Sequence, residues 1–177
     1  DRPLTDADRL LIAHSVSLIS IELEKPVGLI DAEQRLRVAV TQALIDAPGV
    51  REPSLLRYFG FDPDATVVAL VVRGCGPSLD AQAHLHRILH RTGFVYLMCP
   101  HEDGIVVVLP AVDAAEVTAL HRSLTRQFGR DLVTGVSSAG TFGELAAAVG
   151  QAWTASRSRD RESLRRFDEL GLLGVLL

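Results

Sequence analysis

The sequence predicts an α+β domain, in which helices cover a β-sheet of mixed strand direction and a long helix precedes the sheet. Two observations carry this prediction. Between residues 65 and 170, β-branched and apolar runs typical of strands alternate with segments whose apolar residues recur at helical spacing. Two of the strand runs are separated only by a short turn, so the sheet contains an antiparallel hairpin among its helix-connected strands.

The N-terminal part of the chain is predicted to be helical. Residues 4–25 read as a long helix, with Thr5 as its N-cap and the acidic Asp6 in its first turn. Its apolar residues lie on more than one side, so we expect the helix to pack against two neighbours or against a second copy of itself. A second helix is expected at 32–48 and a short one at 53–60.

The remaining elements are expected in the order β-α-β-β-α-β-α-β. The sequence predicts strands at 65–74, 94–99, 104–110, 131–138 and 164–170. It predicts helices at 78–93, 113–130 and 141–160. Thr141 and Glu144, at the start of the last helix, have the spacing of a capping box.

Composition limits the classes of protein to which the chain can belong. The 177 residues are 47% hydrophobic with a net charge of only -4, which excludes a disordered chain and argues against a nucleic-acid-binding surface in this segment. Two cysteines, Cys75 and Cys99, make no disulfide framework, and both are expected to be buried thiols beside strands. No apolar run reaches the roughly 18 residues that a membrane span needs. We therefore expect a cytoplasmic location and no membrane partner.

Two groups of residues could hold a phosphate or a metal ion, and each has a plainer interpretation. The loop "RGCGPS", residues 73–78, lies between a strand and a helix, where a phosphate loop would lie. It has no lysine and no known nucleotide-binding spacing, so a tight turn is favoured. His84, His86 and His90 share one predicted helix, and the last two could chelate a metal ion. No third ligand is near in the sequence, so an exposed helical face is expected.

Three further groups were considered for catalysis or DNA contact. Cys99 and His101 could act as nucleophile and base, but no third group that would orient them is evident. Ser137 and Ser138 lack a nucleophile elbow. The segment 156–166 holds five arginines interleaved with acids, and it is predicted to be a solvated connection, with DNA contact as the alternative. We therefore assign no catalytic, cofactor-binding or metal-binding residue.

An ordered set of segments resembles bacterial transcriptional regulators of the PucR/CdaR type, which control purine and sugar-diacid metabolism. The segments are "VVALVVR", "GIVVVLP", "TGVSS" and the closing "RRFDELGLLGVLL". The resemblance implies that residues 30–170 form the central GGDEF-like, nucleotidyl-cyclase-like domain of such a regulator. It also implies that residues 1–29 form a signalling helix from an upstream sensor domain. Residues 171–177 would begin the connection to a C-terminal helix-turn-helix that is missing from this sequence.

The signature of active diguanylate cyclases is degenerate in this sequence. The positions aligned with it are His101, Glu102, Asp103, Gly104 and Ile105. The paired glycines are absent, and only the central acid survives. The place of the metal-binding Asp after the first strand is held by "RGCG", and the next acid, Asp80, already lies in the helix. The inhibitory Arg-x-x-Asp site is absent too, because Phe94 stands three residues after Arg91.

The resemblance predicts a non-catalytic part of a DNA-binding transcriptional regulator, which relays a signal and supports dimerisation. It implies no enzymatic activity and no cofactor. The expected partners are a second copy of the chain, the upstream sensor domain, DNA through the missing C-terminal domain only, and an unknown small effector. One alternative is a nucleotide-binding module or weak nucleotide-using enzyme with its site in the loop 73–78. Another is a binding module that holds a small effector on its sheet face or hairpin.

Overall fold

The structure, a computed structural model, describes residues 32–47, 53–75, 78–158 and 163–173. The chain divides into two compact units, 1–36 and 37–177. The first unit contributes to the described residues only the start of a helix that runs over residues 32–46. The predicted long helix at 4–25 lies outside the described residues. All further description concerns the second unit.

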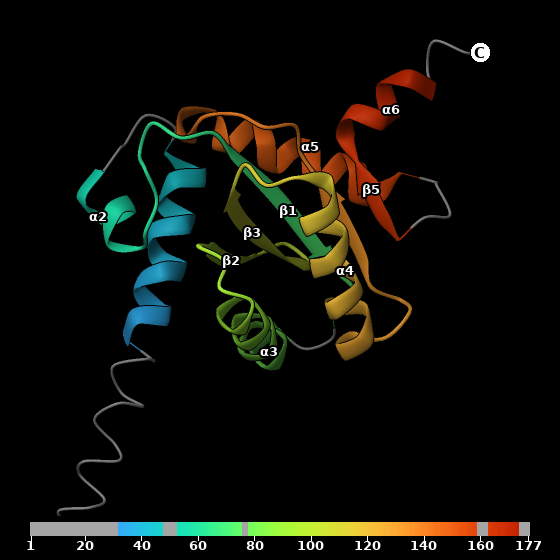
Figure 1. Ribbon diagram of the computed structural model, residues 1–177, viewed down its shortest axis with the longest axis horizontal. Helices are drawn as coiled ribbons and strands as arrows, with labels where there is room; N and C mark the ends of the chain where they lie inside the picture. The colour runs from blue at the N-terminus through green and yellow to red at the C-terminus, as the bar shows by residue number, and fades with distance from the viewer. Residues whose placement is uncertain (1–31, 48–52, 76–77, 159–162, 174–177) are drawn as a thin grey trace, which may run out of the picture. The chain divides into compact units, whose positions relative to one another are not determined.

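The described part of the second unit contains a five-stranded mixed sheet, with strand order β2-β3-β1-β4-β5 (Figure 1). The strands are β1 Val67–Arg73, β2 Leu97–His101, β3 Gly104–Pro110, β4 Val133–Val136 and β5 Leu164–Arg166. Strand β1 pairs antiparallel with both β3 and β4, β2 pairs antiparallel with β3, and β5 pairs parallel with β4. The predicted α+β fold with a mixed sheet is confirmed, in the predicted order of elements.

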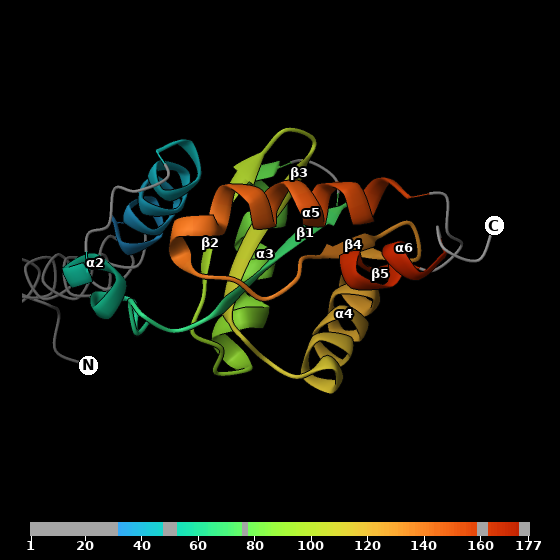
Figure 2. The ribbon, with the colours of Figure 1, turned by 90° about the horizontal axis from the view of Figure 1, so that it is seen from above.

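Helices lie on both faces of the sheet. They are α2 Pro53–Tyr58, α3 Ser78–Arg91, α4 Ala114–Phe128, α5 Leu145–Arg157 and α6 Phe167–Leu173, with the 3-10 turn η1 Phe142–Glu144 before α5. Figures 1 and 2 show α5 across one face of the sheet and α3 with α4 on the other. None of the described helices is long and apolar enough to cross a membrane.

The central strand β1 is buried on both of its faces, as its continuous apolar run predicts. Alternate residues contribute to two separate cores. Val67, Ala69 and Val71 belong to the core beneath α5. Val68, Leu70 and Val72 belong to the core beneath α3 and α4. One strand therefore supports both layers, and the hairpin that pairs with it is fixed between them.

Two capping arrangements fix where helices begin. Asp113 Oδ1 accepts a hydrogen bond from the Glu116 amide at 2.8 Å, and the Glu116 carboxylate accepts one from the Asp113 amide at 3.2 Å, which starts α4. The predicted pairing of Thr141 with Glu144 is also present, because the Glu144 carboxylate accepts from the Thr141 amide at 2.9 Å. The hydrogen bonds from the Thr141 amide and hydroxyl lower the pKa of the Glu144 carboxyl. The pair closes η1, and α5 begins at Leu145.

The second strand differs from its predicted position by three residues. It begins at Leu97 instead of Phe94 and extends to His101. Helix α3 ends at Arg91, and its C-terminal turn contains Gly93 in the left-handed region, with a φ of 75°. The Phe94 amide then donates a hydrogen bond to the Leu89 carbonyl at 3.3 Å. This helix-terminating turn occupies the residues that were predicted to open the strand.

The last strand is shorter than predicted. Strand β5 covers only Leu164–Arg166, and Phe167, which was expected on that strand, begins α6 instead. Asp168 and Glu169 lie in the first turn of α6, where negative charge stabilises a helix through its dipole. The Ser138 hydroxyl, just after β4, donates a hydrogen bond to Asp168. The strand-like "LRRF" run therefore passes into a helix without an intervening loop.

Candidate functional site

The hairpin between β2 and β3 carries the degenerate signature at its tip. His101 is paired with Gly104, so Glu102 and Asp103 form a two-residue turn, and Glu102 takes a left-handed φ of 50°. The turn is tighter than the four residues 100–103 left between the two predicted strands, because Pro100 and His101 belong to β2. Proline is tolerated there because β2 is an edge strand and pairs only with β3 in the described sheet.

Both carboxylates of the turn are bound by arginines from distant parts of the chain. Asp103 Oδ2 accepts hydrogen bonds from Arg73 Nη2 at 2.6 Å and Nε at 3.2 Å. Glu102 Oε2 accepts one from Arg157 Nη2 at 2.5 Å. The hydrogen bond from Arg73 lowers the pKa of the Asp103 carboxyl, which is therefore ionised at neutral pH. Each carboxylate of the turn therefore has one oxygen bound to a guanidinium group.

Trp153, the chain's single tryptophan, lies under these two ion pairs. It projects from α5, and only 6% of its surface is exposed. The guanidinium carbons of Arg157 and Arg73 lie 4.7 Å and 5.5 Å from its ring centroid, close enough for cation-π attraction. The His101 ring lies 6.2 Å away. The indole therefore holds both arginines in place from below.

Gly104 has no room for a side chain. A Cβ at this position would lie 2.8 Å from the Val72 carbonyl oxygen, 3.1 Å from Arg73 Cγ and 3.3 Å from Trp153 Cη2. The first of these atoms belongs to the backbone and cannot move aside. In the cyclase signature this position holds an acid, so the hairpin is packed against β1 in a way that excludes that side chain.

The loop after β1 is a tight backbone turn. Gly74 has a φ of 79°, and a Cβ there would lie 2.3 Å from the Asp131 carbonyl oxygen. Only glycine fits both conditions. Residues 76–77 lie outside the described residues. Arg73, the last residue of β1, turns its guanidinium to Asp103, so a positive charge stands near the place where cyclases carry a metal-binding acid.

Comparison with known proteins identifies the family. A sequence model of the GGDEF-like domain matches residues 51–158, more than half of the chain. The chain belongs to the GGDEF-like domain family. No curated protein matches it.

A solved structure with a similar fold is the crystal structure of the regulator of polyketide synthase expression from Bifidobacterium adolescentis, with a TM-score of 0.57. The two chains are 16% identical, and the match covers 78% of this chain and 59% of that one. This chain thus spans about three fifths of that regulator's length. At this identity the likeness concerns the fold.

His84, His86 and His90 lie on α3 of this GGDEF-like domain, as predicted. The His86 and His90 rings stack with centroids 5.9 Å apart, and His86 is hydrogen-bonded to the Tyr96 hydroxyl. His84 bonds to the Asp80 carbonyl through Nδ1 at 2.8 Å. Only His90 is fully exposed, so the expectation of a wholly exposed face is wrong for the other two, which are half-buried. The described residues contain no group of three His, Cys, Asp or Glu side chains placed to hold a metal ion.

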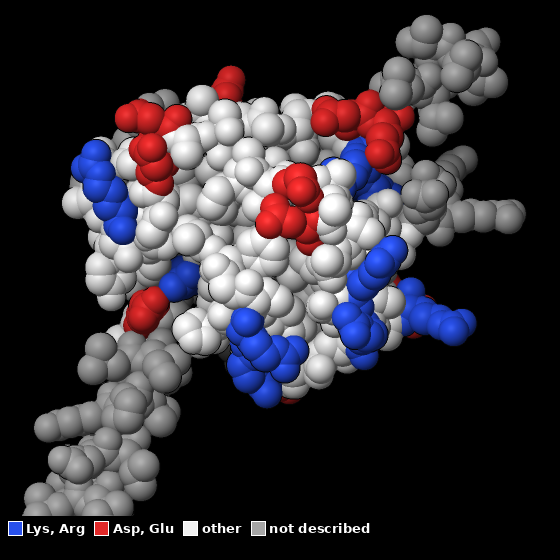
Figure 3. Space-filling model, viewed as in Figure 1, with Lys and Arg blue, Asp and Glu red and all other residues white. Residues whose placement is uncertain are grey.

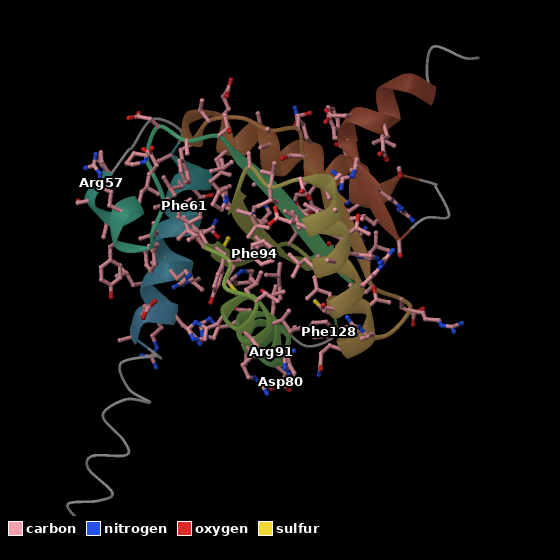
Figure 4. All side chains as sticks on the ribbon, viewed as in Figure 1. Arg57, Phe61, Asp80, Arg91, Phe94 and Phe128 are labelled. Atoms are coloured by element: carbon pink, nitrogen blue, oxygen red, sulfur yellow. The ribbon has the colours of Figure 1, made fainter. Side chains whose placement is uncertain are left out.

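The remaining candidate residues of the GGDEF-like domain have structural roles. Cys99 is fully buried, and burial raises its pKa to about 12, so it is not a thiolate at neutral pH. Cys75 is half-buried, which corrects the expectation that both thiols would be buried. Ser137 Oγ accepts from the Ala69 amide at 2.9 Å and donates to the Ser138 carbonyl at 2.7 Å. Asp80 lies exposed on α3 (Figure 4), so it cannot replace the lost acid beside Arg73.

Sequence reasoning named the acids of the hairpin but missed their partners. Arg73 and Arg157 lie 30 and 55 residues away from the carboxylates that they bind. Trp153 lies on α5, four residues before Arg157. The only signal in the sequence was that two arginines and the single tryptophan end or interrupt otherwise apolar segments, which does not identify a common location.

Proposed function

We propose that this GGDEF-like domain is a non-catalytic part of a bacterial transcriptional regulator of the PucR/CdaR type, where it relays a signal and supports dimerisation. The observation that carries the proposal is the state of the signature hairpin. Its two carboxylates, Glu102 and Asp103, are each bound by an arginine, and Gly104 stands in the place of the second acid.

The chemistry of the hairpin favours this reading over an enzyme. Cyclisation of a nucleoside triphosphate depends on carboxylates that hold two metal ions against the phosphates. Here Arg73 supplies a positive charge where such a site needs a negative one, and its ion pair with Asp103 uses the surviving acid. A divalent cation would be repelled by both guanidinium groups. The same arginines, held over Trp153, stabilise a rigid closed hairpin.

The position of α6 fits a relay. Strand β5 pairs with β4 at one edge of the sheet and continues directly into α6, while Ser138 bonds to Asp168. A displacement of the sheet edge would therefore be passed to α6 without a flexible loop between them. In the proposed regulator, residues 1–29 receive the signal from a sensor domain, residues 30–170 form the relay, and a helix-turn-helix C-terminal to α6 contacts DNA.

The non-catalytic part of the proposal is tested with GTP. The purified chain is incubated with GTP and Mg²⁺ or Mn²⁺, and products are separated by chromatography beside an active diguanylate cyclase as positive control. We expect no cyclic dinucleotide above a protein-free control. Product formed by the chain, and abolished by Asp103→Asn, would overturn the proposal.

The regulatory part is tested with DNA and by mass. We expect the protein encoded by the complete gene to bind its own upstream promoter DNA at near-physiological salt, and the 177-residue chain to bind it no better than an acidic protein does. Light scattering of the chain with and without residues 1–25 tests dimerisation, and removal should shift the mass toward a monomer. Sequence-specific DNA binding by the 177-residue chain would refute the assignment of DNA recognition to a further domain.

A further inference from the structure

A groove runs along the side of α4, away from the hairpin. Its volume is about 770 Å³, and among the described residues it is lined by His121, Arg122, Thr125, Arg126, Arg130 and Ser163. Three of these six side chains are guanidinium groups, and none is a carboxylate. The proposed relay function uses none of them.

Among the described residues, no acid forms an ion pair with the arginines of the groove. Arg122 and Arg126 are four residues apart, which places them on one side of α4. Like charges at this spacing repel one another. Arg130 follows the Gly129 C-cap and lines the same groove. In the part of the chain that the structure describes, Arg122 and Arg130 make no ion pair, and Arg126 makes only long hydrogen bonds of 3.4 Å to the Arg122 carbonyl and the Ser123 hydroxyl.

The helix dipole accounts for only part of this arrangement. Basic residues in a last helical turn interact favourably with the carbonyl end of a helix. That explains Arg126, in the last turn of α4. It does not explain why the basic row faces a groove that also contains buried polar groups. Figure 3 shows the resulting separation, with basic side chains gathered over the far ends of α3 and α4 and acidic ones near the start of α4.

The groove contains a hydrogen-bonded cluster of polar side chains around His121. His121 is only 7% exposed, and its Nδ1 is hydrogen-bonded to Thr134 Oγ1 on β4 at 3.0 Å. Its Nε2 is hydrogen-bonded to Ser163 Oγ at 2.9 Å, and Thr125 Oγ1 lies 3.4 Å from the same nitrogen. A buried imidazole thus fixes one hydroxyl at the edge of the groove beside a second hydroxyl. The Thr125 hydroxyl donates its hydrogen to the His121 carbonyl at 3.0 Å, so it can only accept. Ser163 can donate to a bound oxyanion when its oxygen accepts from a protonated His121 Nε2.

We propose that this groove binds a small phosphate-bearing anion, of the diphosphate or phosphate-ester class. Guanidinium groups present paired donors that match phosphate oxygens, and three of them require a compact ligand with more than one negative charge. Arg122 and Arg126 are one helical turn apart on α4, about 6 Å along the axis, and Arg130 follows the Gly129 C-cap. One or two phosphates can reach neighbouring flexible side chains over such a span.

A small anion fits the groove better than a nucleic acid does. Binding of a duplex depends on many phosphate contacts over a broad basic surface. The chain's net charge is -4, and the acidic Asp113 and Glu116 stand at the other end of the same helix. Three of the basic side chains line this groove, and Arg126 also lines a smaller pocket beside Arg91 of α3.

A ligand in the groove would connect α4 to the start of β5. Ser163 immediately precedes β5, which continues into α6, whereas Arg122 and Arg126 belong to α4. Bound phosphate would therefore brace the strand that leads to α6. The site stands on its own contacts, whether or not the chain belongs to a transcriptional regulator.

Inorganic pyrophosphate is the probe for the test. Isothermal titration of the 177-residue chain with pyrophosphate, at two salt concentrations, is compared with titrations of inorganic phosphate, a phosphate monoester and malonate. We expect one saturable site for pyrophosphate, weaker binding of the single phosphates, and the weakest binding of malonate. Arg122→Gln and Arg130→Gln should each weaken pyrophosphate binding about tenfold, the effect of losing one charged hydrogen bond.

Arg87→Gln is the matched control. Arg87 is an exposed arginine of α3 outside the groove, and its Nε donates only to the Ala83 carbonyl at 3.3 Å. This variant makes the same change in net charge and should leave pyrophosphate affinity unchanged. Circular dichroism of all variants verifies folding, and Arg122→Lys, which keeps the charge, should recover part of the affinity.

Three outcomes would overturn the proposal. The first is pyrophosphate binding weaker than about 1 mM. The second is an equal loss of affinity in Arg87→Gln and Arg122→Gln, which would mean attraction by net charge alone. The third is tighter binding of a DNA duplex than of pyrophosphate, with the duplex binding lost in Arg122→Gln, which would assign the groove to nucleic acid.

Discussion

Replacement of Gly135 by alanine tests how closely α5 packs on the sheet. Gly135 lies in the short strand β4, and an added Cβ would lie 2.0 Å from the Ala152 carbonyl oxygen and 2.6 Å from the Ser156 amide nitrogen. Contacts between carbon and oxygen are relaxed at about 3.3 Å, so α5 would have to move by about 1.3 Å. Both obstructing atoms belong to the α5 backbone, and no side-chain rotation relieves the clash.

The expected loss of stability follows from that displacement. Ala152 and Ala155, on the side of α5 that faces the sheet, are fully buried, so a shifted helix would lose close packing along its whole inner side. Overpacked cores typically lose about 1–3 kcal/mol, and we expect the upper end of that range, about 3 kcal/mol. For a domain whose free energy of unfolding is about 5–15 kcal/mol, this is a large fraction.

Gly150→Ala provides a matched control in the same helix. Gly150 lies inside α5 and is exposed, and an added Cβ would meet nothing within 4 Å. Alanine is favoured over glycine in a helix interior by about 0.5–1 kcal/mol, so this variant should be more stable than the parent. The same added methyl group should therefore destabilise the domain where β4 touches α5 and stabilise it on the exposed side of α5.

Urea unfolding measures both effects. Trp153 is the single tryptophan and is 6% exposed, so its fluorescence reports the loss of the packed state. The free energy of unfolding is taken from transitions with unchanged urea dependence, which indicates that the extent of unfolding is the same in each variant. A loss below about 0.5 kcal/mol in Gly135→Ala, the range of a neutral surface substitution, would refute a rigid backbone contact between α5 and β4.

Three further predictions concern individual side chains. Burial lowers the pKa of His121, so below about pH 6.5 the unfolded chain binds more protons than the folded chain. The free energy of unfolding should therefore decrease as the pH falls. Urea unfolding between pH 8 and 5 should show a smaller decrease for His121→Gln than for the parent. With an aromatic disulfide reagent at pH 8, Cys75 should react first and Cys99 only on unfolding; equal rates would contradict the burial that raises the Cys99 pKa to about 12. Ser138→Ala removes the hydrogen bond to Asp168 and should speed amide hydrogen exchange in α6 but not in α3, and unchanged exchange in α6 would mean that this contact does not hold the helix.

The sequence by itself determined the order of the elements and the fold class. The run "VVALVVR" is apolar at consecutive positions, which only a strand buried on both faces requires, and β1 is such a strand. The short turn between two apolar runs specified the β2–β3 hairpin, and the Thr141–Glu144 spacing marked the start of η1. These features depend on residues that lie close together in the chain, so local pattern contains the information.

Element ends were decided by backbone contacts that the pattern does not contain. The "FVYLMC" run has strand composition throughout, yet its first residues complete the turn that ends α3 at Gly93. The start of α6 at Phe167 is a second example. There the hydrogen bond from Ser138 to Asp168, 30 residues apart, helps a helix to start although the sequence still has strand composition. Propensity is a weak preference that such contacts override.

The candidate sites were decided by the tertiary structure alone. Arg73 meets Asp103 because β1 lies beside β3 in the sheet, and Arg157 reaches Glu102 because α5 crosses the face above that hairpin. In the groove on α4, His121 is hydrogen-bonded to Thr134 on β4 and to Ser163 just before β5, which are 13 and 42 residues away in the sequence. Periodicity in a sequence reports which side of an element is buried, but the neighbours of a side chain depend on strand order, and strand order is set only when the whole sheet packs between its helices.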